Sequence, residues 1–148
     1  MSFAEVTARI NTALSTAGVT ANEKFLEGQM VSTFGAAASA GRILGLTMPQ
    51  MHSTLGLALM QCSGSMQVVV GGDPPSKAIY AAFPNHGGVL SALLGLQGLG
   101  SEIAALEGEA GFFAMYYGGV YNREVLVGGL GEQFVMEDVR FKPWPTSG

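Results

Sequence analysis

Apolar residues recur every three or four positions near the start of the chain, which is the spacing of one face of an α-helix. This face comprises Val6, Ile10, Ala13, Leu14 and Ala17. Ser2 and Glu5 have the spacing of a capping box before it, and Gly18 is a residue type that commonly ends helices. The pattern therefore predicts a first helix over residues 2–18.

A second helix is predicted over residues 32–46, after a polar segment, residues 22–29, that predicts a loop. Small residues fill positions 35–41 without interruption, and Arg42 is the only charged residue of this helix. Small residues four apart allow the backbone of a second helix to approach closely. We therefore expect this helix to pack tightly against a neighbour.

Two later helices are separated by the strongest break in the chain, Gly71-Gly72-Asp73-Pro74-Pro75. The sequence Thr47-Met48-Pro49-Gln50 has a capping box and a proline in the first turn, so it predicts the start of the first of these helices. The other is predicted over residues 76–99. Pro84 should kink or split it, and Asn85 is a candidate cap for its second half.

The last third of the chain predicts short elements. Residues 101–106 and 122–127 predict short helices, and residues 111–117 form a compact aromatic segment. Apolar and polar positions alternate over residues 133–142, which predicts one β-strand. A lone strand leaves backbone groups unpaired, so it needs a partner from another chain or from a part of the protein outside this sequence. The predicted fold class is mainly α, a helical bundle with one late β-strand.

Composition narrows the protein classes. The chain has 148 residues, which predicts one domain, and 48% are hydrophobic while only 12% are charged. This balance excludes a disordered chain, and a net charge of −4 argues against a nucleic-acid partner. A single cysteine excludes a disulfide framework and a cysteine-rich zinc site. With so few charged residues, a free monomer would expose an apolar surface. We therefore expect a homo-oligomer or a complex with a related chain.

Two long stretches, residues 43–72 and 78–101, contain no aspartate, glutamate, lysine or arginine. Both are interrupted by proline, histidine and glutamine, so neither predicts a membrane span and no membrane partner is expected. The N-terminus lacks the basic region of a signal peptide. We therefore expect a cytoplasmic location.

Lys77 is the most informative candidate for chemistry, because it is the only cation between Arg42 and Arg123. It begins an otherwise uncharged helical run, where an ammonium group is costly unless an anion meets it. Two interpretations stay open: a solvated residue of the first helical turn, or a group that binds a substrate carboxylate. Lys142 raises the same question beside Pro143-Trp144-Pro145.

The other candidates have simpler interpretations. His86 follows Pro84 at the expected kink, where it either faces a cleft or has a capping or surface role. His52 has no second ligand at metal-binding spacing, and Cys62 lies among small apolar residues as expected for a buried, inert thiol. The glycine clusters match no phosphate-binding motif. No metal site is predicted.

Several segments, taken in order, resemble the MmgE/PrpD family. They include Thr33-Phe34-Gly35-Ala36-Ala37-Ala38-Ser39-Ala40-Gly41-Arg42-Ile43-Leu44-Gly45-Leu46, Leu55-Gly56-Leu57-Ala58, Cys62-Ser63-Gly64, Ser76-Lys77-Ala78-Ile79, Leu106-Glu107-Gly108, Gly111-Phe112-Phe113, Gly129-Leu130-Gly131-Glu132 and Phe141-Lys142-Pro143-Trp144-Pro145. Each motif alone is weak, but their order and spacing extend over nearly the whole chain.

The resemblance implies metal-free, cofactor-free chemistry at a carbon next to a carboxylate of a small polycarboxylate. The family includes 2-methylcitrate dehydratase, cis-aconitate decarboxylase and an iminodisuccinate epimerase. Its members have a large helical domain and a smaller lid domain and form dimers. By this analogy the chain is a truncated member covering the middle of the helical domain, with residues 1–132 as helical core. Residues 133–148 would then begin a missing lid domain or form a C-terminal tail, and a mitochondrial location becomes an alternative.

The resemblance also implies roles for particular residues. Lys77 and Lys142 match the family's substrate-facing lysines and would bind a carboxylate. Tyr80 stands where the family usually has a histidine, and Leu26 follows Phe25 where a histidine is also common. With those histidines replaced, Tyr80 or His86 would have to move the proton.

Three functional hypotheses follow. The first is a lyase or isomerase that dehydrates, decarboxylates or epimerises a small polycarboxylate, in a pocket completed by a partner chain. The second is a non-catalytic remnant of the family that acts as a binding or assembly module. The third is a short family member recruited to specialised chemistry on an apolar substrate.

Overall fold

The computed structural model describes residues 2–70, 72, 75–138 and 143, and this part of the chain is mainly helical, as predicted. The α-helices are α1 (Phe3–Thr16), α2 (Glu27–Ile43), α3 (Met48–Gln61), α4 (Ala82–Leu96), α5 (Phe112–Tyr117) and α6 (Arg123–Val127). Short 3-10 helices are η1 (Met66–Val68), η2 (Pro75–Ala78) and η3 (Val135–Asp138). Among these described residues, no helix is both long and apolar enough to cross a membrane.

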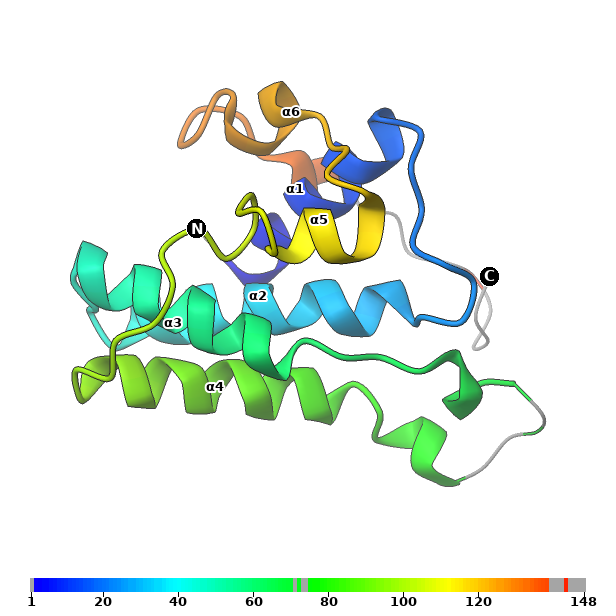
Figure 1. The fold of residues 1–148 in the computed structure, drawn as a ribbon, viewed down its shortest axis with the longest axis horizontal. Helices are drawn as coiled ribbons and strands as arrows, with labels where there is room; N and C mark the ends of the chain where they lie inside the picture. Colours follow the sequence, from blue (N-terminus) through cyan, green and yellow to red (C-terminus); the bar gives the residue numbers. More distant parts are fainter. Residues whose placement is uncertain (1, 71, 73–74, 139–142, 144–148) are drawn as a thin grey trace.

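Helix α2 occupies the centre of the molecule (Figure 1). Helix α4 packs on one side of it and α1 on the other, while α3 contacts both α2 and α4. On the α1 side, the ring of Phe34 from α2 meets the ring of Phe112 from α5 edge to face, with centroids 5.1 Å apart. Both rings are fully buried, so this contact lies in the main apolar core.

The predicted helix starts are confirmed at two places. Ser2 caps α1, where its hydroxyl accepts a hydrogen bond from the Glu5 N–H. At α3, the Thr47 N–H donates to Gln50 Oε1 over 2.9 Å, and Pro49 lies in the first turn. Both caps satisfy backbone donors that have no partner inside the helix.

The expected close packing of the small-residue helix is also confirmed. Helix α4 meets α2 at Gly88, where an added Cβ would lie 2.5 Å from the Ala36 Cβ and 2.6 Å from the Ala37 nitrogen. Helix α2 itself begins at Glu27 rather than at residue 32. Glu27 is favoured in a first turn by the helix dipole, and the fully buried Met30 anchors this turn in the core.

Three local predictions are corrected by the structure. Asn85 does not cap a helix: α4 already begins at Ala82, and the Asn85 side-chain amide donates back to the Ala81 carbonyl. Pro84 lies in the first turn of α4, where its missing N–H costs no hydrogen bond. Residues 101–106 form turns rather than a helix.

The predicted strand over residues 133–142 is wrong where the structure describes it. Val135–Asp138 form the 3-10 helix η3, and residues 139–142 lie outside the described residues. The strand does not form because a side chain of α1 binds the backbone of this segment. The Val135 and Met136 N–H groups donate to the Glu5 carboxylate over 3.2 and 3.0 Å, so they are not available to a neighbouring strand.

A buried ion pair fastens this C-terminal segment to α1. Arg9 and Glu5 are only 3% and 2% exposed, and Arg9 Nε donates to Glu5 Oε1 over 2.6 Å. The remaining guanidinium nitrogens of Arg9 donate to main-chain carbonyls of Val125, Leu126, Gly128 and Gln133. Each charge is thus surrounded by hydrogen bonds, which is the condition for keeping an ion pair buried.

This ion pair predicts an acid-sensitive fold. Burial raises the pKa of the Glu5 carboxyl, but the Met136 N–H, Arg9 and the Val135 N–H together lower it below its ordinary value of 4.5. A lowered folded-state pKa means that the unfolded chain binds more protons in this range. The stabilisation that the charged Glu5 carboxylate gives to the fold is complete above pH 4.5. It is lost as the pH falls through the lowered pKa of Glu5 in the folded protein.

Chemical denaturation across this pH range checks the prediction. The unfolding free energy of the unaltered protein should fall more steeply below pH 4.5 than that of Glu5→Gln, which has no carboxyl to titrate there. Equal pH slopes for the two proteins would contradict it.

Candidate functional site

The candidate site lies at the end of the bundle where α2 begins, and two distant segments meet there. Phe25 and Ser65 form an isolated antiparallel β-bridge, and the Leu26 N–H donates to the Gly64 carbonyl over 3.1 Å. A Cβ at Gly64 would lie 2.7 Å from the Leu26 carbonyl oxygen, so only glycine allows this approach. The chain before α2 is thereby held against the loop after α3.

A cavity of about 240 Å³ opens beside this junction. It is lined by Leu26, Gly28, Gln29, Ser32, Tyr80, Ala81 and Pro84. The Gln29 side-chain amide donates to the Tyr80 carbonyl over 3.4 Å and so links α2 to the turn before α4. The structure therefore brings together Leu26 and Tyr80, the two positions at which the resemblance implies a histidine in other family members.

A second cavity, of about 530 Å³, lies between the same two segments. It is lined by Glu23, Lys24, Ser65, Met66, Gln67 and Val70. Lys24 was not singled out from the sequence, because it belongs to a polar segment that predicts only a loop. The β-bridge between Phe25 and Ser65 is what gives this lysine a place beside a cavity.

The predicted site residues are not all gathered in one place. Lys77 lies on η2 and Tyr80 follows it by three residues in consecutive turns; both side chains are partly buried. His86 is exposed on α4 and does not line either cavity. Lys142 lies outside the described residues. Of the predicted site residues that the structure describes, Tyr80 lines one of these cavities, whereas Lys77, three residues before it, lines neither.

Sequence reasoning missed Gln29 and Ser32, which supply polar groups to the smaller cavity. The Ser32 hydroxyl donates to the Gly28 carbonyl over 2.6 Å, leaving its oxygen lone pairs to accept a hydrogen bond. These uncharged groups can orient a ligand through hydrogen bonds, in the same cavity that Tyr80 lines. In the described part of the chain, no three histidine, cysteine or carboxylate side chains gather as metal ligands.

Cys62 does not contribute to this chemistry. It is buried at the end of α3, and its thiol donates to the Met30 carbonyl over 3.4 Å. Burial raises the pKa of the thiol to about 12, so the nucleophilic thiolate is scarce at neutral pH. The prediction of a buried, inert thiol is confirmed.

Comparison with known proteins identifies the family. Residues 4–124 match the model of the MmgE/PrpD N-terminal domain. Cis-aconitate decarboxylase from Aspergillus terreus (strain NIH 2624 / FGSC A1156) is 32% identical over 126 residues, which cover 79% of this chain and 25% of that protein. A second cis-aconitate decarboxylase sequence from Aspergillus terreus gives the same figures. The chain spans about a quarter of the length of these curated relatives, and it belongs to the MmgE/PrpD N-terminal domain family.

Proposed function

We propose that this chain forms part of a lyase-type enzyme that acts next to a carboxylate of a small polycarboxylate or related metabolite. Family membership and the similarity to cis-aconitate decarboxylase support this class. The observation that carries the site assignment is that Leu26 and Tyr80, more than fifty positions apart in the sequence, line one cavity. Three reactions fit this proposal: dehydration, decarboxylation and epimerisation.

In this proposal Lys77 binds a substrate carboxylate and the Tyr80 hydroxyl moves a proton. Dehydration and epimerisation break a C–H bond next to a carboxylate, and decarboxylation breaks a C–CO₂ bond. In each case the electron pair of the broken bond stays on the carbon. Decarboxylation then releases carbon dioxide and adds a proton, epimerisation returns the proton to the other face, and dehydration expels hydroxide. A lysine ammonium beside the carboxylate stabilises the developing negative charge in each case.

We also propose that a further chain completes the pocket. Both cavities at this end of the bundle are open, and the matched relatives are about four times longer than the matched region. Lys142 remains a proposed second carboxylate ligand, and His86 remains the proposed alternative to Tyr80 for proton transfer.

Proton exchange in D₂O, followed by NMR, tests the function. The purified chain is incubated with citrate, 2-methylcitrate, cis-aconitate and alkyl-substituted analogues, with and without a full-length relative. Deuterium uptake or product signals should fall about tenfold or more in Lys77→Ala, which removes the carboxylate-binding charge. Arg123→Ala, a change of the same charge at an exposed position of α6, is the control and should retain the rate. Equal rates for the two variants would overturn the role of Lys77.

The second candidate is a non-catalytic assembly module, and it is favoured by the outer face of α4. Phe83, Val89, Leu90, Leu93 and Leu96 are exposed along this face, with Phe83 60% exposed. In this case we propose that a second copy or a related chain covers the helix. The absence of exchange with every substrate, from a preparation that sediments as an oligomer, would favour this candidate over the enzyme.

A further inference from the structure

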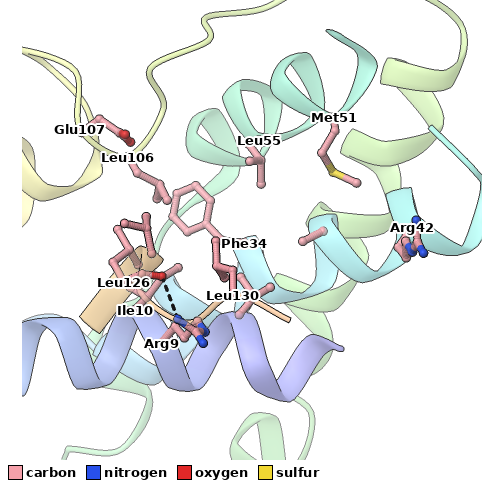
Figure 2. A pocket seen from close by; sticks show the side chains of 13 residues that line it. Arg9, Ile10, Phe34, Arg42, Met51, Leu55, Leu106, Glu107, Leu126 and Leu130 are labelled. Atoms are coloured by element: carbon pink, nitrogen blue, oxygen red, sulfur yellow. Dashed lines mark hydrogen bonds between the residues drawn. The ribbon is translucent and has the colours of Figure 1, made fainter. Parts of the chain in front are cut away.

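A third cavity lies away from the candidate site, along the second half of α2. Its volume is about 380 Å³, within the range of small-molecule pockets. Its walls include Phe34, Ala38 and Arg42 of α2, Met51 and Leu55 of α3, and Ile10 of α1. Figure 2 shows Ile10, Phe34 and Leu55 around one space between the three helices. It shares no lining residue with the cavity that contains Tyr80.

Two walls of this cavity, on α2 and α3, are formed by residues spaced along their helices. Phe34, Ala38 and Arg42 are four residues apart on α2, so they form one stripe along the helix. At 1.5 Å of rise per residue the stripe is about 12 Å long. Met51 and Leu55 form a parallel stripe on α3, also four residues apart. Two such stripes fit an extended apolar chain better than a compact polar molecule.

The two ends of the cavity differ in charge. Arg42 lies at one end and Glu107 at the other, on opposite sides of Phe34 and Leu55 (Figure 2). The third charged lining residue, Arg9, is buried and already paired with Glu5. Arg42 is exposed, and within the described residues it makes no ion pair, because the ion pair found there joins Arg9 to Glu5. Its guanidinium group is therefore able to receive an anion, whereas the Glu107 end would repel one.

We propose that this cavity binds an amphiphilic carboxylate, such as a medium-chain fatty acid. The carboxylate receives hydrogen bonds from the guanidinium group of Arg42. The apolar chain extends over Ala38 and Leu55 toward Phe34 and is removed from water there. The single alanine in the middle of the α2 stripe leaves the space that the chain occupies. This binding site is independent of the proposed lyase function.

An NMR titration with three probes of equal chain length tests the proposal. Decanoate, decanol and decyltrimethylammonium are added separately to ¹⁵N-labelled protein below their aggregation concentrations. Decanoate should cause saturable shifts at Ala38 and Leu55, and decyltrimethylammonium should bind more weakly. Arg42→Gln should weaken decanoate binding about tenfold and leave decanol unchanged, because only the carboxylate uses the guanidinium group.

Two further variants separate this cavity from other apolar surfaces. Ala38→Phe fills the middle of the cavity and should abolish the binding of decanoate and decanol, while circular dichroism reports whether the fold is retained. Leu93→Gln, on the exposed face of α4, should leave both affinities unchanged. The proposal is overturned if Arg42→Gln binds decanoate normally, if folded Ala38→Phe still binds it, or if the cationic probe binds equally well.

Discussion

Arg9→Met is expected to lower the free energy of unfolding by about 3–5 kcal/mol, a large share of the stability of a domain this size. The methionine keeps most of the side-chain volume but removes every hydrogen bond of the guanidinium group. The Glu5 carboxylate, 2% exposed, then stays buried without its counter-charge. Carbonyl oxygens at the end of α6 lose their donor as well, including the Gly128 oxygen 2.7 Å away.

Chemical denaturation measures this loss, and Arg123→Met provides the matched control. That variant removes an arginine of the same charge from an exposed position, so its unfolding free energy should change little. Adding Glu5→Gln to Arg9→Met should recover part of the loss, because the unpaired buried charge is then gone. Equal stabilities for Arg9→Met and Arg123→Met would show that the buried pair contributes nothing.

Gly88→Ala is expected to destabilise the protein by about 1–3 kcal/mol, although alanine is the better helix former. The added Cβ would lie 2.6 Å from the Ala37 nitrogen and 2.9 Å from the Ala36 carbonyl carbon. Both are backbone atoms in the middle of α2, so they cannot move aside as a flexible side chain would. The two helices must separate, and the contacts around this point are weakened.

Gly28→Ala is the matched substitution with the opposite expected sign. Gly28 lies in the first turn of α2, and a Cβ added there would meet no atom within 4 Å. Removing the glycine there should leave stability unchanged or raise it by up to about 1 kcal/mol. Thermal denaturation of the two variants gives the comparison, and a loss of the same size in both would contradict the close contact between α2 and α4.

The helices of this fold were predictable where their determinants are local. Thr47 and Gln50, which cap α3, lie only three positions apart, so the sequence alone predicts the start of this helix. The small residues around Ala36 predict a close helix contact, but they do not identify the partner helix. The strand prediction failed because its determinant is not local. The N–H groups of Val135 and Met136 bind a carboxylate from the first turns of α1, which alternation of apolar residues cannot reveal.

The same distinction applies to the sites. Lys77 was singled out because it is the only cation between Arg42 and Arg123, and Tyr80 because the family resemblance marks its position. Gln29 was missed because it lies in a polar segment, and it reaches Tyr80 only through the fold. Glu5 and Arg9 were missed for another reason. A glutamate and an arginine four residues apart normally indicate a weak ion pair on a helix surface, and nothing in the spacing shows that both are buried.

The central position of α2 has a consequence for how the protein unfolds. One side of this helix gives Phe34 to the aromatic core with Phe112, and the other gives Ala36 and Ala37 to the contact with Gly88. Neither layer therefore retains a core of its own if α2 is lost. We expect a single cooperative transition, in which the amides on both sides of α2 become open to hydrogen exchange together.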